Sequence, residues 1–158
     1  MDALFATGLN FCFPSGLLTC TGAETVYDTT VAITSCIDGK LTPRAAVTDG
    51  VTPTTDIVTG LAFRPMTANQ GCVIVWMLQG STVRCTQGTI TPLAEGGAFV
   101  LAPDFPDLPR NMAPFAYQVL RAGSTAGTIT FGTSNWNATG FTNVIQNVAF
   151  KPSRPQIA

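Results

Sequence analysis

The stretch that most constrains this chain is Gly71–Gln87, which reads GCVIVWMLQGSTVRCTQ. Its run of apolar residues, Cys72–Leu78, is dominated by β-branched and aromatic side chains, which predicts a buried strand. Gly80-Ser81 follows with glycine first, as a type II′ hairpin turn requires. A second strand over Thr82–Gln87 would complete a hairpin.

The two faces of this predicted hairpin differ in character. A two-residue turn sets the opposed pairs as Leu78–Val83, Met77–Arg84, Trp76–Cys85 and Val75–Thr86. The expected core face consists of Cys72, Ile74, Trp76, Leu78, Val83 and Cys85. The other face places Val75 and Met77 beside Arg84, which is too apolar for simple exposure to water. We therefore expect Val75, Met77 and Arg84 to form an assembly surface.

The composition also favours assembly. Charged residues make up 11% of the 158 residues, against about 25% in typical soluble proteins, while 46% are apolar. The simplest account is that other copies or a larger particle cover much of the surface. A net charge of −1 disfavours nucleic acid as a partner, and no apolar run is long enough for a membrane span. No Lys or Arg precedes Lys40, which argues against a secretory signal.

Several classes of chemistry are disfavoured by residue type. The chain has no histidine, so neither Ser-His-Asp nor Cys-His catalysis is available. Five cysteines without a CxxC motif predict buried, reduced side chains instead of a disulfide framework or a zinc site. Asp104 and Asp107 are the remaining candidates for hydrolysis, but turn chemistry explains them. We expect no catalytic residue, no metal site and no cofactor.

Residues 1–24 form a distinct apolar segment. Leu9, Phe11 and Phe13 alternate with other residues, and Phe5 precedes them, while Pro14 and several glycines oppose a long helix. We interpret the segment as an extended arm, either folded over its own domain or reaching onto a neighbour. An ordinary first strand with a ragged lead-in is the alternative.

The remaining chain predicts an all-β domain over residues 25–150, followed by a proline-containing tail over 151–158. Further strands are expected in a hairpin over Thr29–Val47 turning at Asp38-Gly39, and over Leu61–Arg64, Thr89–Leu93, Ala98–Leu101, Phe115–Leu120, Thr128–Phe131 and Phe141–Phe150. Pro103–Pro114 should be a stiff loop whose Phe105 and Leu108 pack downward. Short strands separated by turn signals indicate an antiparallel β-sandwich or barrel, jelly-roll-like in character.

Trp136 is the best candidate for ligand stacking. It lies in the polar loop 132–140, flanked by Asn135 and Asn137, whose amides suit sugar hydroxyls. The alternative, which we favour, is that its ring closes the end of the barrel as part of the core.

Much of the chain between residues 30 and 156 resembles a β-rich module of tailed-bacteriophage virion proteins. The similar segments are IDGKLTPRAA (37–46), TPTTDIVTGLAFRPMTANQGCVIVWML (52–78), TQGTITPL (86–93), APDFPDLPRNMAPFAYQVLRAGSTAGTITFGTSNWNATG (102–140) and NVAFKPSRPQ (147–156). The resemblance implies a non-enzymatic, homotrimeric protein displayed on a virion that is assembled in the host cytoplasm.

Two roles are compatible with this resemblance. The first is a capsid decoration (cement) protein that binds the major capsid protein on the capsid surface. Its expected contacts are Phe5, Leu9, Phe11, Phe13, Val75, Met77 and Arg84. The second is a head-fibre or tail-associated module that binds a host glycan through Trp136, Asn135 and Asn137.

Overall fold

The computed structural model of the chain describes residues 10–14, 17–153 and 155, and these residues form strands and loops without a helix. The strands are Phe11–Phe13 (β1), Leu18–Thr19 (β2), Val26–Thr29 (β3), Ile33–Ile37 (β4), Lys40–Arg44 (β5), Val47–Val51 (β6), Gln70–Gln79 (β7), Thr82–Gln87 (β8), Thr91–Pro92 (β9), Ala113–Ala122 (β10) and Phe141–Asn147 (β11). Among the described residues, none forms a helix that is long and apolar enough to span a bilayer.

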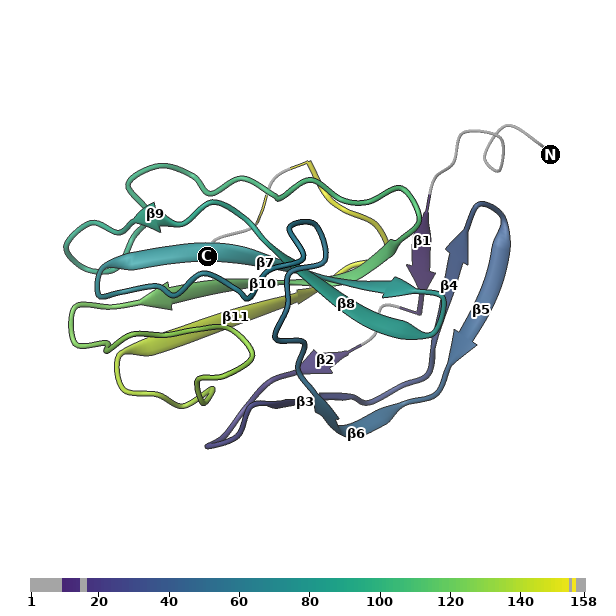
Figure 1. The fold of residues 1–158 in the computed structure, drawn as a ribbon, viewed down its shortest axis with the longest axis horizontal. Coiled ribbons are helices and arrows are strands. Elements are labelled where there is room, and N and C mark those ends of the chain that lie inside the picture. Colours follow the sequence, from purple (N-terminus) through teal and green to yellow (C-terminus); the bar gives the residue numbers. More distant parts are fainter. Residues whose placement is uncertain (1–9, 15–16, 154, 156–158) are drawn as a thin grey trace.

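The strands form three antiparallel sheets. The largest has the order β11-β10-β7-β8, with β9 paired to the start of β7, and it extends along the long axis of the molecule (Figure 1). Two smaller sheets have the orders β1-β4-β5 and β2-β3-β6. The sheets do not close into a barrel, so the all-β antiparallel prediction is confirmed in its sandwich form.

The central hairpin has the predicted register. Leu78 opposes Val83, Met77 opposes Arg84 and Trp76 opposes Cys85. Gly80 has a φ of +62°, the left-handed value that a type II′ turn requires at its first central position. The apolar run and the turn glycine were therefore sufficient to fix this part of the fold.

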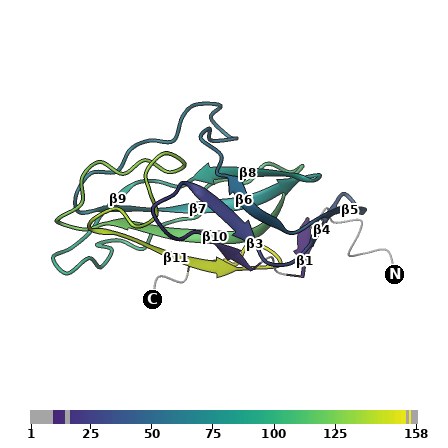
Figure 2. The same ribbon diagram turned by 90° about the horizontal axis from the view of Figure 1, so that it is seen from below.

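The main core lies between the large sheet and the two small sheets. The predicted core face of the hairpin is buried there, with Trp76 at its centre. The ring of Tyr27 from β3 lies 5.1 Å from the Trp76 ring, and the rings of Phe131 and Phe115 lie 5.5 and 6.4 Å away. All three contacts are tilted towards an edge-to-face geometry, which aromatic pairs prefer. Figure 2 shows β3 crossing over the strands of the large sheet at this point.

The turn of the second predicted hairpin is also confirmed, whereas two short strands are not. Asp38 and Gly39 both have positive φ values, 49° and 76°, as a type I′ turn between β4 and β5 requires. Leu61–Arg64 and Thr128–Phe131 were wrongly predicted as strands. Each makes only an isolated bridge, from Ala62 to Thr55 and from Ile129 to Met66, because no neighbouring strand extends alongside them.

The prediction that Pro114 lies outside the strands was also wrong. β10 begins at Ala113 and includes Pro114, although β10 lies between β7 and β11. The register with β7 shifts between Pro114 and Ala116, so a bulge accommodates the missing N–H group. The third predicted hairpin is reduced to β9 and a bridge from Leu93 to Phe99.

Candidate functional site

The second face of the central hairpin is buried within the chain itself, which corrects the expectation that it meets another copy. Val75 and Met77 are 1% and 0% exposed. They belong to a second apolar cluster together with Tyr117 and Val119 of β10. The proposed assembly role of Val75 and Met77 is therefore wrong.

This face is covered by the proline-rich segment, residues 99–112, which lies between β9 and β10 in the chain. The segment runs along the large sheet (Figure 1). Phe105 packs edge-on against Tyr117 with ring centroids 5.1 Å apart, and Leu108 joins the same cluster, as predicted for both side chains. The carbonyl oxygen of Asp104 comes so close to Gly88 that a Cβ there would lie 2.8 Å from it. The segment thus acts as a third layer over the sheet.

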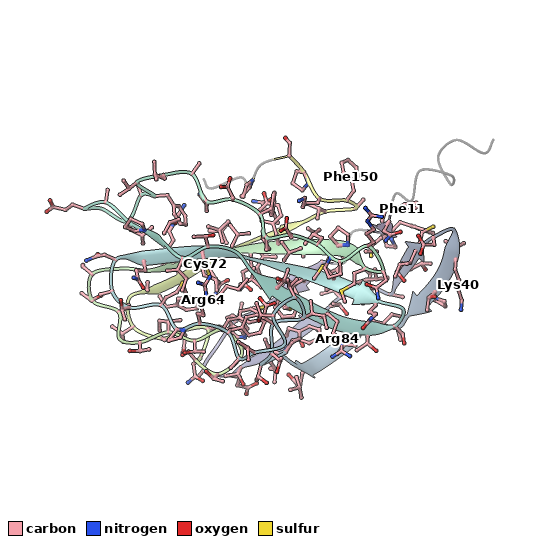
Figure 3. All side chains as sticks on the ribbon, turned by 45° about the horizontal axis from the view of Figure 1, so that its top comes forward. Phe11, Lys40, Arg64, Cys72, Arg84 and Phe150 are labelled. Atoms are coloured by element: carbon pink, nitrogen blue, oxygen red, sulfur yellow. The ribbon has the colours of Figure 1, made fainter. Side chains whose placement is uncertain are left out.

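Arg84 is the part of that predicted surface that remains exposed. Its side chain extends from β8 into solvent (Figure 3), and its Nε donates a long hydrogen bond of 3.4 Å to Oε1 of Gln79. Whether Arg84 contacts another copy stays a prediction.

The described part of the N-terminal segment folds onto its own domain. Its strand β1 pairs with β4, and Cys12, Leu18 and Cys20 are buried in the main core. Phe5 and Leu9 lie outside the described residues. Phe11 is half-buried and Phe13 is 43% exposed, with their rings 5.9 Å apart. Of the four contact residues predicted in this segment, Phe11 and Phe13 are therefore the two that the structure describes.

Trp136 is buried and cannot stack on a sugar, which corrects the glycan-contact prediction. It is 4% exposed, its Nε1 donates a 2.7 Å hydrogen bond to the carbonyl oxygen of Val26, and its ring packs on Phe131. The core role that we favoured for Trp136 is confirmed, because its ring belongs to the main core, although the sheets form no barrel for it to close. Asn135 and Asn137 are exposed on either side of it.

Asp56 is the one buried carboxylate among the described residues, and the structure gives it a structural role. Its oxygens accept hydrogen bonds from the backbone N–H groups of Gln87 at 2.7 Å and Val58 at 2.8 Å, and from Oγ1 of Thr86. Ile57 N also donates to the carbonyl oxygen of Cys85. Asp56 therefore holds the loop 52–61 against the outer edge of β8. This edge has no neighbouring strand, so the loop covers backbone groups that would otherwise be unpaired.

The five thiols are buried and unpaired with one another. Burial raises the pKa of Cys12 and of Cys72 to about 12, and it raises the pKa of Cys85 as well. A nucleophilic or metal-binding cysteine needs a lowered pKa, so Cys12, Cys72 and Cys85 serve as small apolar groups in the core. No group of three or more metal-binding side chains occurs within the described ranges.

Exposed apolar side chains are numerous on this molecule. The large ones are Phe13, Leu17, Leu41, Val51, Val58, Leu61, Val100, Leu101 and Phe150. Phe13 and Phe150 come from opposite ends of the chain but lie at one end of the fold, because the N–H group of Cys12 donates a 2.9 Å hydrogen bond to the carbonyl oxygen of Ala149. Figure 3 shows Phe11 and Phe150 at this end. We call Phe11, Phe13 and Phe150 the terminal aromatic patch.

Comparison with known proteins adds no relative to this description. Scans against protein-family models, curated proteins and solved structures all find no match.

Proposed function

We propose that this chain is a non-enzymatic structural protein of a tailed-phage virion, a decoration protein that binds the outer capsid and stabilises it. The observation that carries the proposal is the terminal aromatic patch, which exposes 43% of Phe13 and 60% of Phe150. Large aromatic side chains supply most of the energy of protein contacts, and solvation alone gives no reason to leave them exposed.

The sparse charge of the surface supports the same role. Charged residues account for 11% of the sequence, while large apolar side chains such as Val51 and Leu101 are exposed in several places. A free monomer with such a surface tends to associate, whereas copies held on a lattice cover it. Many identical weak contacts on one particle also add up through avidity. The proposed partners are the major capsid protein and two further copies in a homotrimer.

Capsid binding can be tested with a double substitution of the terminal aromatic patch. Phe13→Ser with Phe150→Ser should reduce the protein that co-sediments with capsids at least 10-fold, since each buried aromatic contributes about 2 kcal/mol at an interface. The capsids would come from the phage that encodes the chain, with this gene deleted. Thr139→Ala, at an exposed polar side chain outside the patch, is the control and should leave co-sedimentation unchanged.

Two results would contradict the proposal. Undiminished co-sedimentation of the double variant would show that the patch is not the contact. Electron microscopy that finds wild-type protein on a head fibre or on the tail, and not on the capsid lattice, would favour the alternative role. Light scattering of the wild-type protein gives the number of copies in the free oligomer.

A further inference from the structure

A cavity lies at the far end of the molecule from the terminal aromatic patch. β7 and β10 are antiparallel, with Gln70 opposite Ala122, so the residues just before β7 and just after β10 meet there. The loop after β9 joins them, and the space between has a volume of about 480 Å³. Sites for small ligands commonly range from about 300 to 1,000 Å³.

Backbone hydrogen bonds fix the walls of this loop-end pocket. The N–H group of Leu93 donates to the carbonyl oxygen of Asn69 at 2.8 Å, and that of Gly123 donates to the carbonyl oxygen of Gly140 at 2.8 Å. Within the loop that follows β9, the N–H group of Gly97 donates a hydrogen bond to the carbonyl oxygen of Ala94 at 2.9 Å. The pocket is therefore held by main-chain contacts, which leaves its side chains available for a ligand.

The polar side chains that line the pocket have no partner within the described part of the chain. Asn69, Glu95, Ser124 and Thr125 all line the pocket and are exposed, and no hydrogen bond or ion pair to another described residue engages their side chains. Together they offer an amide, a carboxylate and two hydroxyl groups within one concave surface. This set both donates and accepts hydrogen bonds.

The charge of the pocket limits the class of ligand. Glu95 is the charged residue of the lining, and neither Lys nor Arg lines it. A phosphate, a sulfate or an acidic sugar would meet the Glu95 carboxylate without a compensating cation. Leu93 supplies a small apolar contact, but no aromatic ring lines the pocket. The lining therefore suits a neutral ligand with many hydroxyl groups.

We propose that the loop-end pocket binds one unit of a neutral saccharide. This site differs from the Trp136 loop and does not depend on the decoration role, since the terminal aromatic patch lies at the other end of β10. Asn10, beside the patch, donates to the carbonyl oxygen of Met112 just before β10, whereas Gly123 of the pocket follows β10. A virion protein attached through the patch would then present the pocket away from its contact.

Saturation-transfer NMR with the full chain tests this proposal. The probes are the methyl glycosides of glucose, galactose, mannose and N-acetylglucosamine, with methyl glucuronide as the anionic comparison. We expect at least one neutral glycoside to bind with a Kd of about 1 mM, which corresponds to roughly −4 kcal/mol and suits a site without aromatic stacking. Glu95→Gln should weaken this binding about 10-fold, because charge-assisted hydrogen bonds are about twice as strong as neutral ones. Ser124→Ala should weaken it about 5-fold.

Asn135→Ala is the matched control, because Asn135 is an exposed polar residue outside the pocket, and it should leave binding unchanged. The proposal is overturned if no neutral glycoside binds at millimolar concentration, or if the glucuronide binds best. It is equally overturned if binding survives both pocket substitutions. Capsid co-sedimentation of Glu95→Gln should remain normal, so the two proposals fail independently.

Discussion

Met77 and Arg84 oppose each other across the central hairpin, yet their surroundings are entirely different. The side chain of Met77 lies under the proline-rich segment, against Tyr117 and its neighbours, and is 0% exposed. Arg84 is on the outer strand β8, past the edge of that cover, and extends into solvent. Two residues that are paired across a hairpin can therefore differ completely in burial. The sequence shows that a strand face is apolar, but it does not show whether the same chain or another chain buries that face.

Met77→Lys should destabilise the fold by about 3 kcal/mol or more, because an ammonium group would be buried without a partner. Urea unfolding followed by tryptophan fluorescence measures the change. Arg84→Ala, at the opposed position, should change the free energy of unfolding by no more than about 0.5 kcal/mol. Equal midpoints for the two variants would place Met77 at the surface, in conflict with the observed packing.

At the scale of strands and turns, the sequence predicted elements whose determinants are local. The β7–β8 hairpin follows from one apolar run and from Gly80, and the β4–β5 turn follows from Asp38-Gly39. Leu61–Arg64 has similar local character but has no strand beside it, so it remains a loop with a single bridge. Pairing depends on distant chain segments, which short-range patterns do not contain.

The candidate sites were harder to predict for the same reason. The polar neighbours of Trp136 are compatible with both a ligand contact and a core role, and the deciding partner, the carbonyl oxygen of Val26, lies far away in the chain and accepts a hydrogen bond from the indole N–H group. The loop-end pocket combines three loops separated by long stretches of sequence, and none of them carries a recognisable motif. Only the fold brings Asn69, Glu95 and Ser124 together.

The close packing of the proline-rich segment on the large sheet rests on glycine at one strand position. Gly71 lies near the start of β7, where a Cβ would come within 2.7 Å of both the carbonyl oxygen of Leu120 and the ring of Phe99. Its φ is not positive, so the requirement for glycine is one of space and not of backbone conformation.

Gly71→Ala should therefore lower the free energy of unfolding by about 2 kcal/mol, since neither the β10 backbone nor the Phe99 ring can move without disturbing the sheet. Gly127→Ala is the comparison, because a Cβ at Gly127 meets nothing within 4 Å. Thermal unfolding of both variants gives the difference. A Gly71 variant as stable as the Gly127 variant would show that Phe99 is not packed at this position.

At the scale of the whole molecule, the chain forms a sandwich with an additional cover. The two small sheets close one face of the large sheet, and the proline-rich segment closes the other. With both faces of the large sheet covered, the exposed side chains come from the small sheets, from the loops and from the ends of the molecule. One end carries the terminal aromatic patch and the other carries the loop-end pocket. This arrangement gives an attachment protein two separate surfaces.

The N-terminal segment takes part in this architecture, so deletions of different length should have different consequences. Removal of residues 1–23 would delete β1 and β2 and take Cys12, Leu18 and Cys20 out of the main core. The loss of several buried apolar side chains costs more than about 5 kcal/mol, which is comparable to the entire stability of a small domain. We expect that this variant is unfolded or aggregated.

Removal of residues 1–9 leaves β1 to β11 in place and should leave a folded sandwich. Circular dichroism and thermal unfolding of both truncations distinguish these outcomes, and capsid co-sedimentation of the shorter deletion then isolates the contribution of Phe5 and Leu9 to binding. Retained binding after removal of residues 1–9 would assign the contact to the terminal aromatic patch. A cooperatively folded protein after removal of residues 1–23 would mean that β1 and β2 are dispensable, contrary to their burial in the core.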